Sequence, residues 1–482
     1  MNELPELCRQ PKMLIDGRWR SGSGDREESV VNPASAEAIA RYRIPSAADL
    51  DEALESAARG FRVWRQTPAF SRGKVLRRAA ALLRERSEQI ANVLTMEEGK
   101  PLAEARGELL VTIEMFEWFA EEGLRAYGRM IPARAAQLQQ TVVREPVGPT
   151  AAFAAWNFPA RNPGYKIAAA LAAGCSCVAK PAEETPLTCL LLAQALLDAG
   201  LPAGVLNVVY GDAAAISQHL IASPVIRKIS FTGSTRVGKL LAKQAADTVK
   251  KVTLELGGHA PVIICDDADI ELAVQLTATA KFRNAGQVCI APTRFYVHEA
   301  RYRAFVARFA AFAGSLAVGN GLDSGTAMGP LFHQRRTPEM ERFVADARAR
   351  HADIVCGGNA LARPGYFWAP TVIADLADDT RLMNEEPFGP IAGIVPFSNL
   401  DDVIERANGL PYGLAAYAFT RSLHAAHELG ARLECGMLGI NTCKVSYAET
   451  PFGGVKESGY GSEGAMEGLD AFLVSKLISM AY

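Results

Sequence analysis

The amino-acid sequence predicts an α/β protein with a doubly wound, mostly parallel sheet and a second α/β domain. Between about residues 140 and 265, short runs of small or β-branched residues alternate with helical segments; the runs are TAAFAAW, CSCVAK, VLNVVYG, KISFTG and PVIIC. Two of the helical segments end at Gly174 and Gly200, which suit helix C-caps. Strands separated by helices form βαβ units, whose strands run parallel. A second alternation, between about 290 and 440, predicts the second domain.

The segments on either side of this region differ from it. Apolar residues recur at helical spacing from Leu50 to Trp64 and again from Leu76 to Leu94. We therefore expect the first 125 residues to be helical after a short irregular start. The apolar final segment, AFLVSKLISMAY, predicts an edge strand that pairs with another subunit.

The composition is that of a soluble globular protein of more than one domain. The chain has 482 residues, 49% of them hydrophobic and 22% charged, with a net charge of −2. There is no basic excess that would hold nucleic acid, and no apolar run reaches the roughly 18 residues of a membrane span. The first twenty residues lack the apolar core of a signal peptide. We expect neither nucleic acid nor membrane as a partner.

Cysteine usage indicates a reducing compartment. The nine cysteines are odd in number and have no framework spacing, which predicts free thiols in a cytoplasmic protein. Cys175 and Cys177 stand two apart, but no second pair or histidine cluster accompanies them. We expect no metal site.

Ligands of doubly wound sheets bind at the carboxyl ends of the strands, so the loops there carry the candidate chemistry. In KISFTGSTRVGK, a strand and a tight turn precede a helix predicted from about Thr235, whose free amides would suit a phosphate. In KPAEETP, Lys180 and Glu183 could contact a polar ligand, and a carboxylate there could accept from ribose hydroxyls. Taken alone, the first stretch is more often an ordinary turn and the second more often a solvated loop.

Two further residues are candidates for catalysis. Glu255 ends an apolar strand in VTLELGGHAP, where a partly desolvated carboxylate could act as a general base, or could simply face water. Cys289 lies in KFRNAGQVCIAP, and taken alone a cysteine is most often a small buried apolar residue.

The order of these motifs resembles that of the NAD(P)-dependent aldehyde dehydrogenase superfamily. The motifs are WNFP, KPAEETP, FTGST, ELGG, FRNAGQVC, EEPFGP and PFGGVKESG, and the resemblance extends over residues 12–482. Within the superfamily the chain is most similar to the succinate-semialdehyde dehydrogenase branch, through KFRNAGQVC and PFGGVKESGYG.

The resemblance implies three parts. Residues 1–124 and 147–256 would form a Rossmann-type NAD-binding domain, and residues 257–460 an α/β catalytic domain. Residues 125–146 and 461–482 would form a β extension for oligomerisation. Pairing an edge strand between subunits hides its free backbone groups, so a homodimer or homotetramer is expected.

The resemblance also implies catalytic roles. The thiolate of Cys289 would attack the aldehyde carbon, and the side-chain amide of Asn157 and the Cys289 N–H would hold the oxyanion. Activation of Cys289 would come from the surrounding site or from Glu255 acting through water, and Glu255 would later activate the water that hydrolyses the thioester. Lys166 and Glu463 match a pair proposed to relay protons. CoA-acylating relatives lack the glutamate, so Glu255 favours a free acid product. The presence of Cys289, Glu255 and Asn157 together disfavours a non-catalytic relative.

For the cofactor, the resemblance implies a larger set of contacts. Lys180 and Glu183 would hold the adenosine ribose, and the remaining positions would contact the pyrophosphate and nicotinamide riboside: Trp156, Gly233, Ser234, Leu256, Gly257, Glu386 and Phe388. A carboxylate accepts from a 2′-hydroxyl but repels a 2′-phosphate, so Glu183 predicts NAD rather than NADP.

For the substrate, Arg283 matches an arginine that binds the carboxylate of succinate semialdehyde. A second family arginine is replaced here by Tyr165. Arg161 lies four residues earlier and would share a helical face with Tyr165. Lys444, Ser446 and Phe452 match the mouth of the substrate tunnel.

The expected substrate is therefore a carboxylate-bearing aldehyde held by Arg161, Arg283 and Lys444, with succinate semialdehyde first. The alternative structural interpretation makes Arg283 a helix-end residue and points Arg161 to solvent. Tyr165, with Trp118 nearby, favours an aromatic acid-bearing aldehyde as the second candidate.

Overall fold

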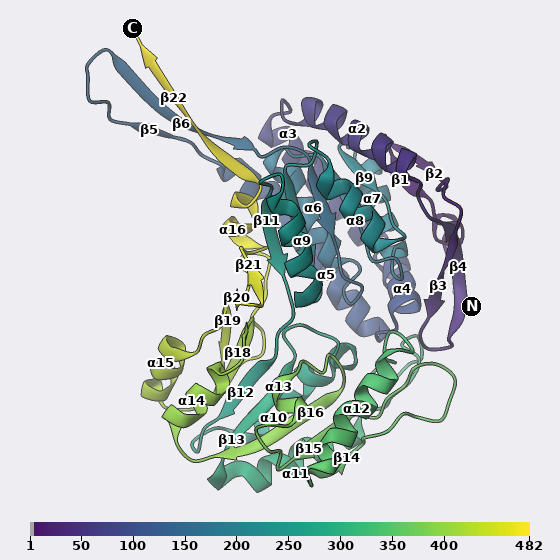
Figure 1. Cartoon of the computed structure of the whole chain (residues 1–482), viewed down its shortest axis with the longest axis vertical. Helices are drawn as coiled ribbons and strands as arrows, with labels where there is room; N and C mark the ends of the chain where they lie inside the picture. The colour runs from purple at the N-terminus through teal and green to yellow at the C-terminus, as the bar shows by residue number, and fades with distance from the viewer. Residues whose placement is uncertain (1–3) are drawn as a thin grey trace.

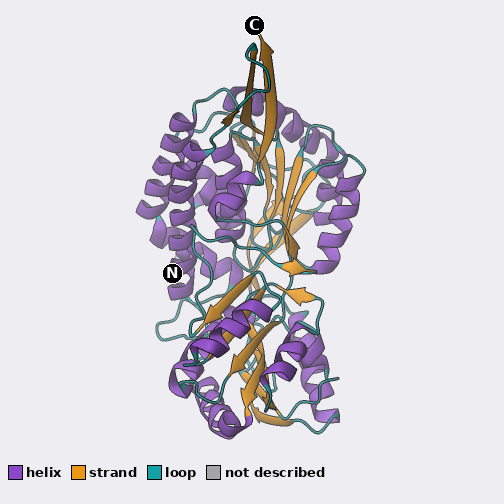
Figure 2. Cartoon of the chain, turned by 90° about the vertical axis from the view of Figure 1, so that its left-hand side faces the viewer, coloured by secondary structure: helices purple, strands orange, loops and turns teal. Residues whose placement is uncertain are grey.

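The computed structural model describes residues 4–482. Figures 1 and 2 show two large β-sheets that lie end to end, with helices on both faces of each. The buried apolar residues divide into two clusters, one around each sheet. The α/β fold expected from the alternation of strands and helices is confirmed.

The first sheet has eight strands in the order β2-β1-β9-β8-β7-β10-β11-β21. Its strands are β1 (Met13–Ile15), β2 (Arg18–Arg20), β7 (Thr150–Phe153), β8 (Cys177–Lys180), β9 (Leu206–Val208), β10 (Lys228–Thr232), β11 (Lys251–Glu255) and β21 (Gly459–Tyr460). The five strands from β9 to β11 in this order are parallel, and the outer pairings are antiparallel. The carboxyl ends of those five strands consequently meet at one edge of the sheet.

Apart from the short helices α1 (Glu6–Arg9) and α16 (Ala465–Asp470), the helices of this half belong to two stretches of the chain. They are α2 (Ala47–Trp64), α3 (Ala69–Glu85), α4 (Ser87–Glu98), α5 (Leu102–Glu122), α6 (Arg161–Ala173), α7 (Leu187–Asp198), α8 (Ala213–Ala222) and α9 (Thr235–Ala246). The predicted start of a helix at Thr235 is confirmed, and so is the C-cap at Gly174, which has a left-handed φ of 95°. Figure 2 shows that these helices cover the sheet from both sides.

The second sheet has seven strands in the order β14-β15-β16-β13-β12-β18-β19. Its strands are β12 (Ala260–Ile264), β13 (Pro292–His298), β14 (Asp353–Cys356), β15 (Thr371–Ala374), β16 (Ile391–Phe397), β18 (Ala415–Phe419) and β19 (Met437–Ile440). The flanking helices are α10 (Ile270–Phe282), α11 (Glu299–Ser315), α12 (Arg336–Ala349), α13 (Arg381–Asn384), α14 (Leu400–Asn408) and α15 (Leu423–Arg432). The chain enters this sheet through the loop between Glu255 and Ala260.

A narrow three-stranded sheet projects from the first half of the molecule (Figure 1). It consists of β5 (Arg129–Ile131), β6 (Leu138–Pro146) and β22 (Leu473–Ala481), in the order β22-β6-β5. β22 pairs with β6 along its whole length, from Leu473 opposite Pro146 to Ala481 opposite Leu138. β22 is an edge of this sheet, as the apolar closing segment predicts.

The prediction for the N-terminal region was wrong between residues 13 and 43. This stretch is not irregular but forms β1, β2, β3 (Glu27–Asn32) and β4 (Glu37–Arg43). β1 and β2 have only three residues each, too few for a periodic pattern. β1 is fixed by its antiparallel contact with β9, which lies far away in the sequence.

Within residues 4–482, no helix is long and apolar enough to span a membrane, and no group of three potential metal-ligating side chains occurs. All nine cysteines are free.

Candidate active site

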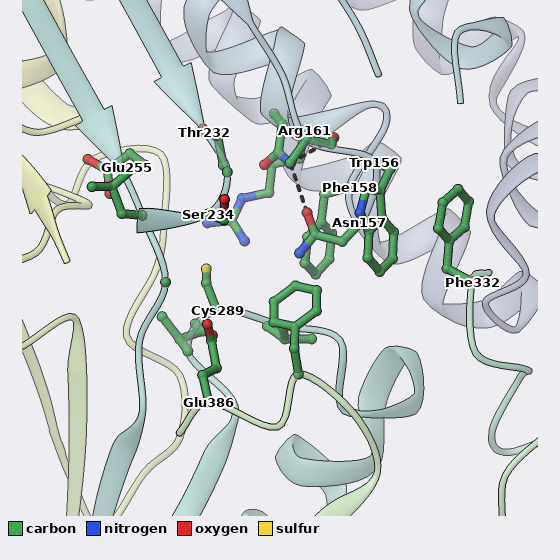
Figure 3. A pocket seen from close by; sticks show the side chains of 18 of the residues that line it. Trp156, Asn157, Phe158, Arg161, Thr232, Ser234, Glu255, Cys289, Phe332 and Glu386 are labelled. Atoms are coloured by element: carbon green, nitrogen blue, oxygen red, sulfur yellow. Dashed lines mark hydrogen bonds between the residues drawn. The ribbon is translucent and has the colours of Figure 1, made fainter. Parts of the chain in front are cut away.

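A cavity of about 300 Å³ lies at the carboxyl ends of the parallel strands of the first sheet. Its walls come from the loops after β7, β10 and β11, from the segment around Cys289 and from the loop around Glu386 (Figure 3). Ligand sites gather at this edge of an α/β sheet because the connecting loops meet there.

The chain reaches Cys289 through an unusual backbone turn after α10. Asn284, Ala285 and Gly286 all have left-handed φ angles, of 49°, 51° and 72°. A Cβ on Gly286 would lie 2.1 Å from the carbonyl oxygen of Gly389, so only glycine fits there. Non-glycine residues in this region of φ/ψ space cost energy. They persist only where the surrounding structure holds the backbone in place, and they are common at active sites.

Buried polar contacts hold this turn against the loop after β7. The Asn284 N–H donates to Oε2 of Glu104 at 2.8 Å, and its side chain donates to the carbonyl of Asn157 at 3.0 Å. The same carbonyl accepts from Nζ of Lys100 at 2.8 Å, and Lys100 also donates to Glu108 at 2.6 Å. The backbone of the two loops that carry Cys289 and Asn157 is thereby fixed as one unit.

The Cys289 side chain points into the cavity (Figure 3). Burial raises the pKa of its thiol to about 12, Arg161 opposes the rise, and Glu386 and Glu255 add to it. At neutral pH the group is therefore a thiol in this structure, and it needs a base to become a nucleophile.

The side-chain amide of Asn157 also faces the cavity. Its Nδ2 donates to the carbonyl of Gln287 at 3.0 Å, two residues before Cys289. Gln287 is fixed in turn, since its side chain donates to the Asn284 carbonyl at 3.0 Å and accepts from the Phe332 N–H at 2.9 Å. An uncharged donor is thus positioned close to the sulfur, as an oxyanion site requires.

Glu255 ends β11, is buried and lines the cavity, and neither of its oxygens has a hydrogen-bond partner in the described residues. Burial, followed by the charge of Glu463, raises its pKa well above the ordinary value. Glu463 also lines the cavity, and it accepts from Lys166 at 2.5 Å and from Ser230 at 3.1 Å. The Glu255 carboxyl points away from Cys289 in Figure 3, so acting on that residue requires rotation of its side chain.

One side of the cavity is aromatic. Trp156 stacks on Phe332 with ring centroids 4.2 Å apart and meets Phe388 edge-on at 5.6 Å. Flat apolar walls of this kind suit a planar ring.

Gly233 and Ser234 also line the cavity, at the N-terminus of α9. Ser234 is the N-cap and accepts from the Val237 N–H at 3.4 Å. The remaining N-terminal amides and the helix dipole suit a phosphate group.

The loop between α13 and β16 brings the Glu386 carboxylate into the cavity, against the loop after β11. Its Oε1 accepts from the Gly258 N–H at 3.2 Å, and a Cβ on Gly257 would lie 2.5 Å from its Oε2. Gly257 therefore allows this approach, and Leu256 lines the wall beside it. Burial raises the pKa of Glu386 to about 7.

Lys180 and Glu183 lie at the end of β8 but are not among the residues that line the cavity. Their side chains form an ion pair with each other. The next residue, Glu184, pairs at 3.1 Å with Arg335, which does line the cavity.

Arg161, Tyr165 and Phe452 also line the cavity. Arg161 and Tyr165 are one turn apart on α6, as expected, and Nη2 of Arg161 lies 3.4 Å from the Tyr165 hydroxyl. The guanidinium also donates to Ser446 and lies 5.1 Å from the Phe452 ring centroid, 5.3 Å from that of Tyr165 and 5.8 Å from that of Phe158. Arg161 is therefore a cation enclosed by aromatic rings.

The other predicted substrate residues lie outside the cavity lining. Arg283 is the C-cap of α10, and its guanidinium lies 5.5 Å from the centroid of the Phe158 ring. Lys444 is exposed, Ser446 reaches the site only through Arg161, and Trp118 is not part of the lining. Of the three basic side chains expected to form the pocket, the structure brings Arg161 alone into the cavity.

Several lining residues were not predicted from the sequence. They are Ala155, Phe158, Asn162, Thr232, Val288, Ile290, Phe332, His333, Arg335 and Arg336. The stretch 332–336 carries no motif and approaches the cavity only through tertiary contacts, such as the bond from the Phe332 N–H to Gln287. Asn162 directly follows the predicted site residue Arg161 on α6, and this proximity is the one feature of the sequence that could have identified it as a lining residue.

Comparison with known proteins identifies similar sequences and structures over the full length. Residues 19–478 match the aldehyde dehydrogenase family. The chain is 48% identical to 4-(hydroxymethyl)benzenesulfonate dehydrogenase TsaD1 of Comamonas testosteroni, with 98% of both chains covered. It is 42% identical to the succinate-semialdehyde dehydrogenase [NADP(+)] GabD of Escherichia coli strain K12, covering 98% of this chain and 97% of that one.

A solved structure supports the same family. The crystal structure of succinate-semialdehyde dehydrogenase from Burkholderia pseudomallei superposes with a TM-score of 0.97 at 42% identity and 99% coverage of both chains. The chain therefore belongs to the aldehyde dehydrogenase family and is an oxidoreductase that oxidises aldehydes.

Proposed function

We propose that this enzyme oxidises aldehydes that carry a second, anionic group, with succinate semialdehyde as the first candidate, and releases the free acid. The observation that carries the proposal is Arg161, a guanidinium in the wall of the cavity that contains Cys289. Its side chain is held by Ser446 and the surrounding rings, so a substrate anion would meet a charge already in position. The names of the relatives from Escherichia coli and Comamonas testosteroni specify one carboxylate and one sulfonate substrate.

The proposed chemistry begins when Glu255, acting through a water molecule, takes the proton of the Cys289 thiol, and the sulfur attacks the aldehyde carbon. The carbonyl oxygen becomes an oxyanion, which the Asn157 amide and the Cys289 N–H stabilise. A bound nicotinamide cofactor supplies the hydride acceptor. Glu255 then removes a proton from the water that hydrolyses the Cys289 thioester, and Lys166 and Glu463 carry protons between the buried carboxyl and solvent.

The cofactor would lie on the aromatic side of the cavity. Its phosphates would bind at Ser234, and the nicotinamide riboside would meet Glu386 beside the rings of Trp156 and Phe388. Family members use NAD or NADP, and the Escherichia coli relative is named for NADP(+). We infer a preference for NAD because the carboxylate of Glu183 would repel a 2′-phosphate.

A second candidate substrate is an aromatic aldehyde that carries a sulfonate or carboxylate. The rings of Phe158, Tyr165 and Phe452 surround Arg161, and flat rings favour a flat ligand. The Comamonas testosteroni relative acts on a benzenesulfonate.

We further propose that β22 pairs across a subunit interface. Its outer edge has no partner strand in the described residues, and Leu477, Ile478 and Met480 are exposed on it. An unpaired, partly apolar edge of this length is a site for association, which would give a homodimer or homotetramer.

The test is a panel of matched aldehydes with NAD. It compares succinate semialdehyde with butanal, and 4-formylbenzenesulfonate with 4-methylbenzaldehyde. We expect a higher kcat/KM for the anionic aldehyde than for the neutral one in at least one pair. Arg161→Met should lower the ratio of the two kcat/KM values by about 30-fold or more, because the substrate anion loses a partly buried cation as its partner. Arg283→Met is the matched control and should change the preference less.

Two results would contradict the proposal. Equal kcat/KM values for the anionic and neutral members of both pairs would exclude an anion-selective site. Formation of an acyl-CoA when CoA is added would exclude the free acid as the product.

A further inference from the structure

We propose that Asn162 is a positioning residue that fixes the orientation of the Asn157 carboxamide, so that an N–H rather than the carbonyl oxygen faces the substrate oxyanion. The inference rests on the proposed function, in which Asn157 stabilises that oxyanion. Asn162 touches neither the sulfur of Cys289 nor Glu255 through any described hydrogen bond, and it would act only through Asn157.

A primary amide can present either its oxygen or its nitrogen to the same point in space. The two orientations differ by a half-turn about one bond and occupy nearly the same volume, so packing alone does not choose between them. For an oxyanion site the choice is decisive, since an amide oxygen in place of the N–H would repel the developing negative charge.

Hydrogen-bond partners remove this ambiguity in the structure. Nδ2 of Asn162 donates to the carbonyl of Ala155 at 3.2 Å and to Oδ1 of Asn157 at 3.1 Å. Nδ2 of Asn157 donates to the carbonyl of Gln287 at 3.0 Å. Backbone carbonyls only accept, so these two outer carbonyls orient both amides.

Reversing either amide would place two acceptors against each other. A reversed Asn162 would direct its oxygen at the Ala155 carbonyl and at Oδ1 of Asn157. A reversed Asn157 would direct its oxygen at the Gln287 carbonyl and its NH₂ at that of Asn162. In the observed arrangement every contact pairs a donor with an acceptor, and Asn157 keeps its second N–H for a ligand in the cavity.

The backbone around Asn157 is already rigid, which leaves the amide rotation as the remaining freedom. Lys100 and Asn284 donate to the Asn157 carbonyl at 2.8 and 3.0 Å. Glu108 accepts from the Ala160 N–H at 2.8 Å at the start of α6. The same first turn of α6 carries Asn162, whose own N–H donates to the Phe158 carbonyl at 2.9 Å.

Two substitutions separate donation from shape. Asn162→Asp keeps the size but replaces the donor with an acceptor, and Asn162→Leu removes all hydrogen bonding. The readout is the single-turnover rate of cofactor reduction at saturating aldehyde, together with the KM of the aldehyde. We expect both variants to lose rate by about tenfold or more with little change in KM, because one oxyanion donor is worth about 10²- to 10³-fold.

The pH dependence gives a signature that a merely structural role would not produce. A protonated aspartic acid has an O–H that can donate to Oδ1 of Asn157, whereas the ionised form cannot. Two oxygens face that carboxyl, which favours its neutral form. The ratio of the Asn162→Asp rate to the wild-type rate should therefore rise as pH falls from about 8 to about 5, and the ratio for Asn162→Leu should stay flat.

A double-mutant cycle shows which residue carries the effect. In an Asn157→Ala background, the Asn162 substitutions should cause no further loss, because the amide that they orient is absent. Asn359→Asp is the matched control, since Asn359 is exposed and its side chain donates to the Ala360 carbonyl, outside the cavity lining, and it should retain the wild-type rate. Circular dichroism and thermal unfolding establish that each variant is folded, and the cycle needs only the Leu variants if the Asp variant does not fold.

Three outcomes would overturn the inference. The first is an equal, pH-independent loss of single-turnover rate in Asn162→Asp and Asn162→Leu. The second is a loss of rate that is just as large in the Asn157→Ala background, and the third is a change in KM with no change in rate. The proposed function fails separately: an Asn157→Ala enzyme with the wild-type rate would show that Asn157 is not the oxyanion donor, independently of any result at Asn162.

Discussion

Nζ of Lys166 lies 2.5 Å from Oε1 of Glu463, and the buried Glu255 carboxyl lies near this pair without a hydrogen bond of its own. Burial is the main reason that the pKa of Glu255 is raised, and the charge of Glu463 raises it further. The pair therefore tunes the group that we propose as the base for thioester hydrolysis.

Replacement of Glu463 by glutamine should shift the pH profile of turnover. Removing its negative charge lowers the pKa of Glu255, so Glu255 ionises at a lower pH, and the acidic limb of the kcat profile moves to lower pH. The measurement is kcat against pH under conditions where hydrolysis limits the rate. Glu255→Gln is the control and should abolish the limb along with most turnover; an unchanged or upward-shifted limb in Glu463→Gln would contradict the coupling.

Alkylation of Cys289 should be slow at neutral pH when no cofactor is present. Burial raises the pKa of this thiol to about 12, so the rate with iodoacetamide should still be rising at about pH 10, where free cysteine has already levelled off. Mass spectrometry of the peptide that contains Cys289 measures the rate. Arg161→Met should slow it further, because Arg161 lowers that pKa; a plateau near pH 7 would exclude a protonated resting thiol.

Loss of Lys100 should destabilise the fold. Lys100 and Glu108 are both about 1% exposed in their side chains, and Nζ of Lys100 donates to Glu108 at 2.6 Å. Lys100→Met leaves Glu108 buried without its cation, which should lower the free energy of unfolding by about 3–5 kcal/mol. Urea and thermal unfolding measure the change.

The control for that substitution is an exposed ion pair. Lys239 pairs with Glu457 at 2.6 Å, but both side chains are about half exposed. Lys239→Met should therefore change stability by at most about 1 kcal/mol. Equal decreases in the free energy of unfolding for Lys100→Met and Lys239→Met would show that burial does not increase the contribution of the Lys100–Glu108 pair to stability.

Cofactor choice should respond to Glu183. Replacing it with serine removes the carboxylate that would oppose a 2′-phosphate and frees Lys180 from its ion pair, so that the ammonium can bind the phosphate. We expect kcat/KM for NADP to rise by at least about tenfold and that for NAD to fall, because an opposed charge is replaced by an attractive one. Initial rates with each cofactor test this, and an unchanged ratio of NADP to NAD would place the discrimination elsewhere.

Much of the fold and part of the site could be predicted from the sequence. A βαβ chain has one preferred topology, so the ends of the strands after Phe153, Thr232 and Glu255 meet at a single edge. The residues of WNFP, FTGST and ELGG therefore share one cavity. The strands at residues 13–43 could not be predicted, because β1 is stabilised by a distant partner rather than by a local pattern.

The direction and pairing of side chains were decided by the tertiary structure. Arg161, Arg283 and Lys444 are equivalent cations in the sequence, yet Arg161 alone enters the cavity, since α6 is oriented by its contacts and Lys444 lies on an exposed loop. Likewise, the role proposed for Asn162 depends on folding. Folding places the Ala155 carbonyl against the Asn162 amide and the Gln287 carbonyl against the Asn157 amide, so that the two amides are oriented with respect to each other. Local sequence determines where most helices and the longer strands lie, whereas contacts between distant residues fix short strands such as β1 and determine which way a polar group points.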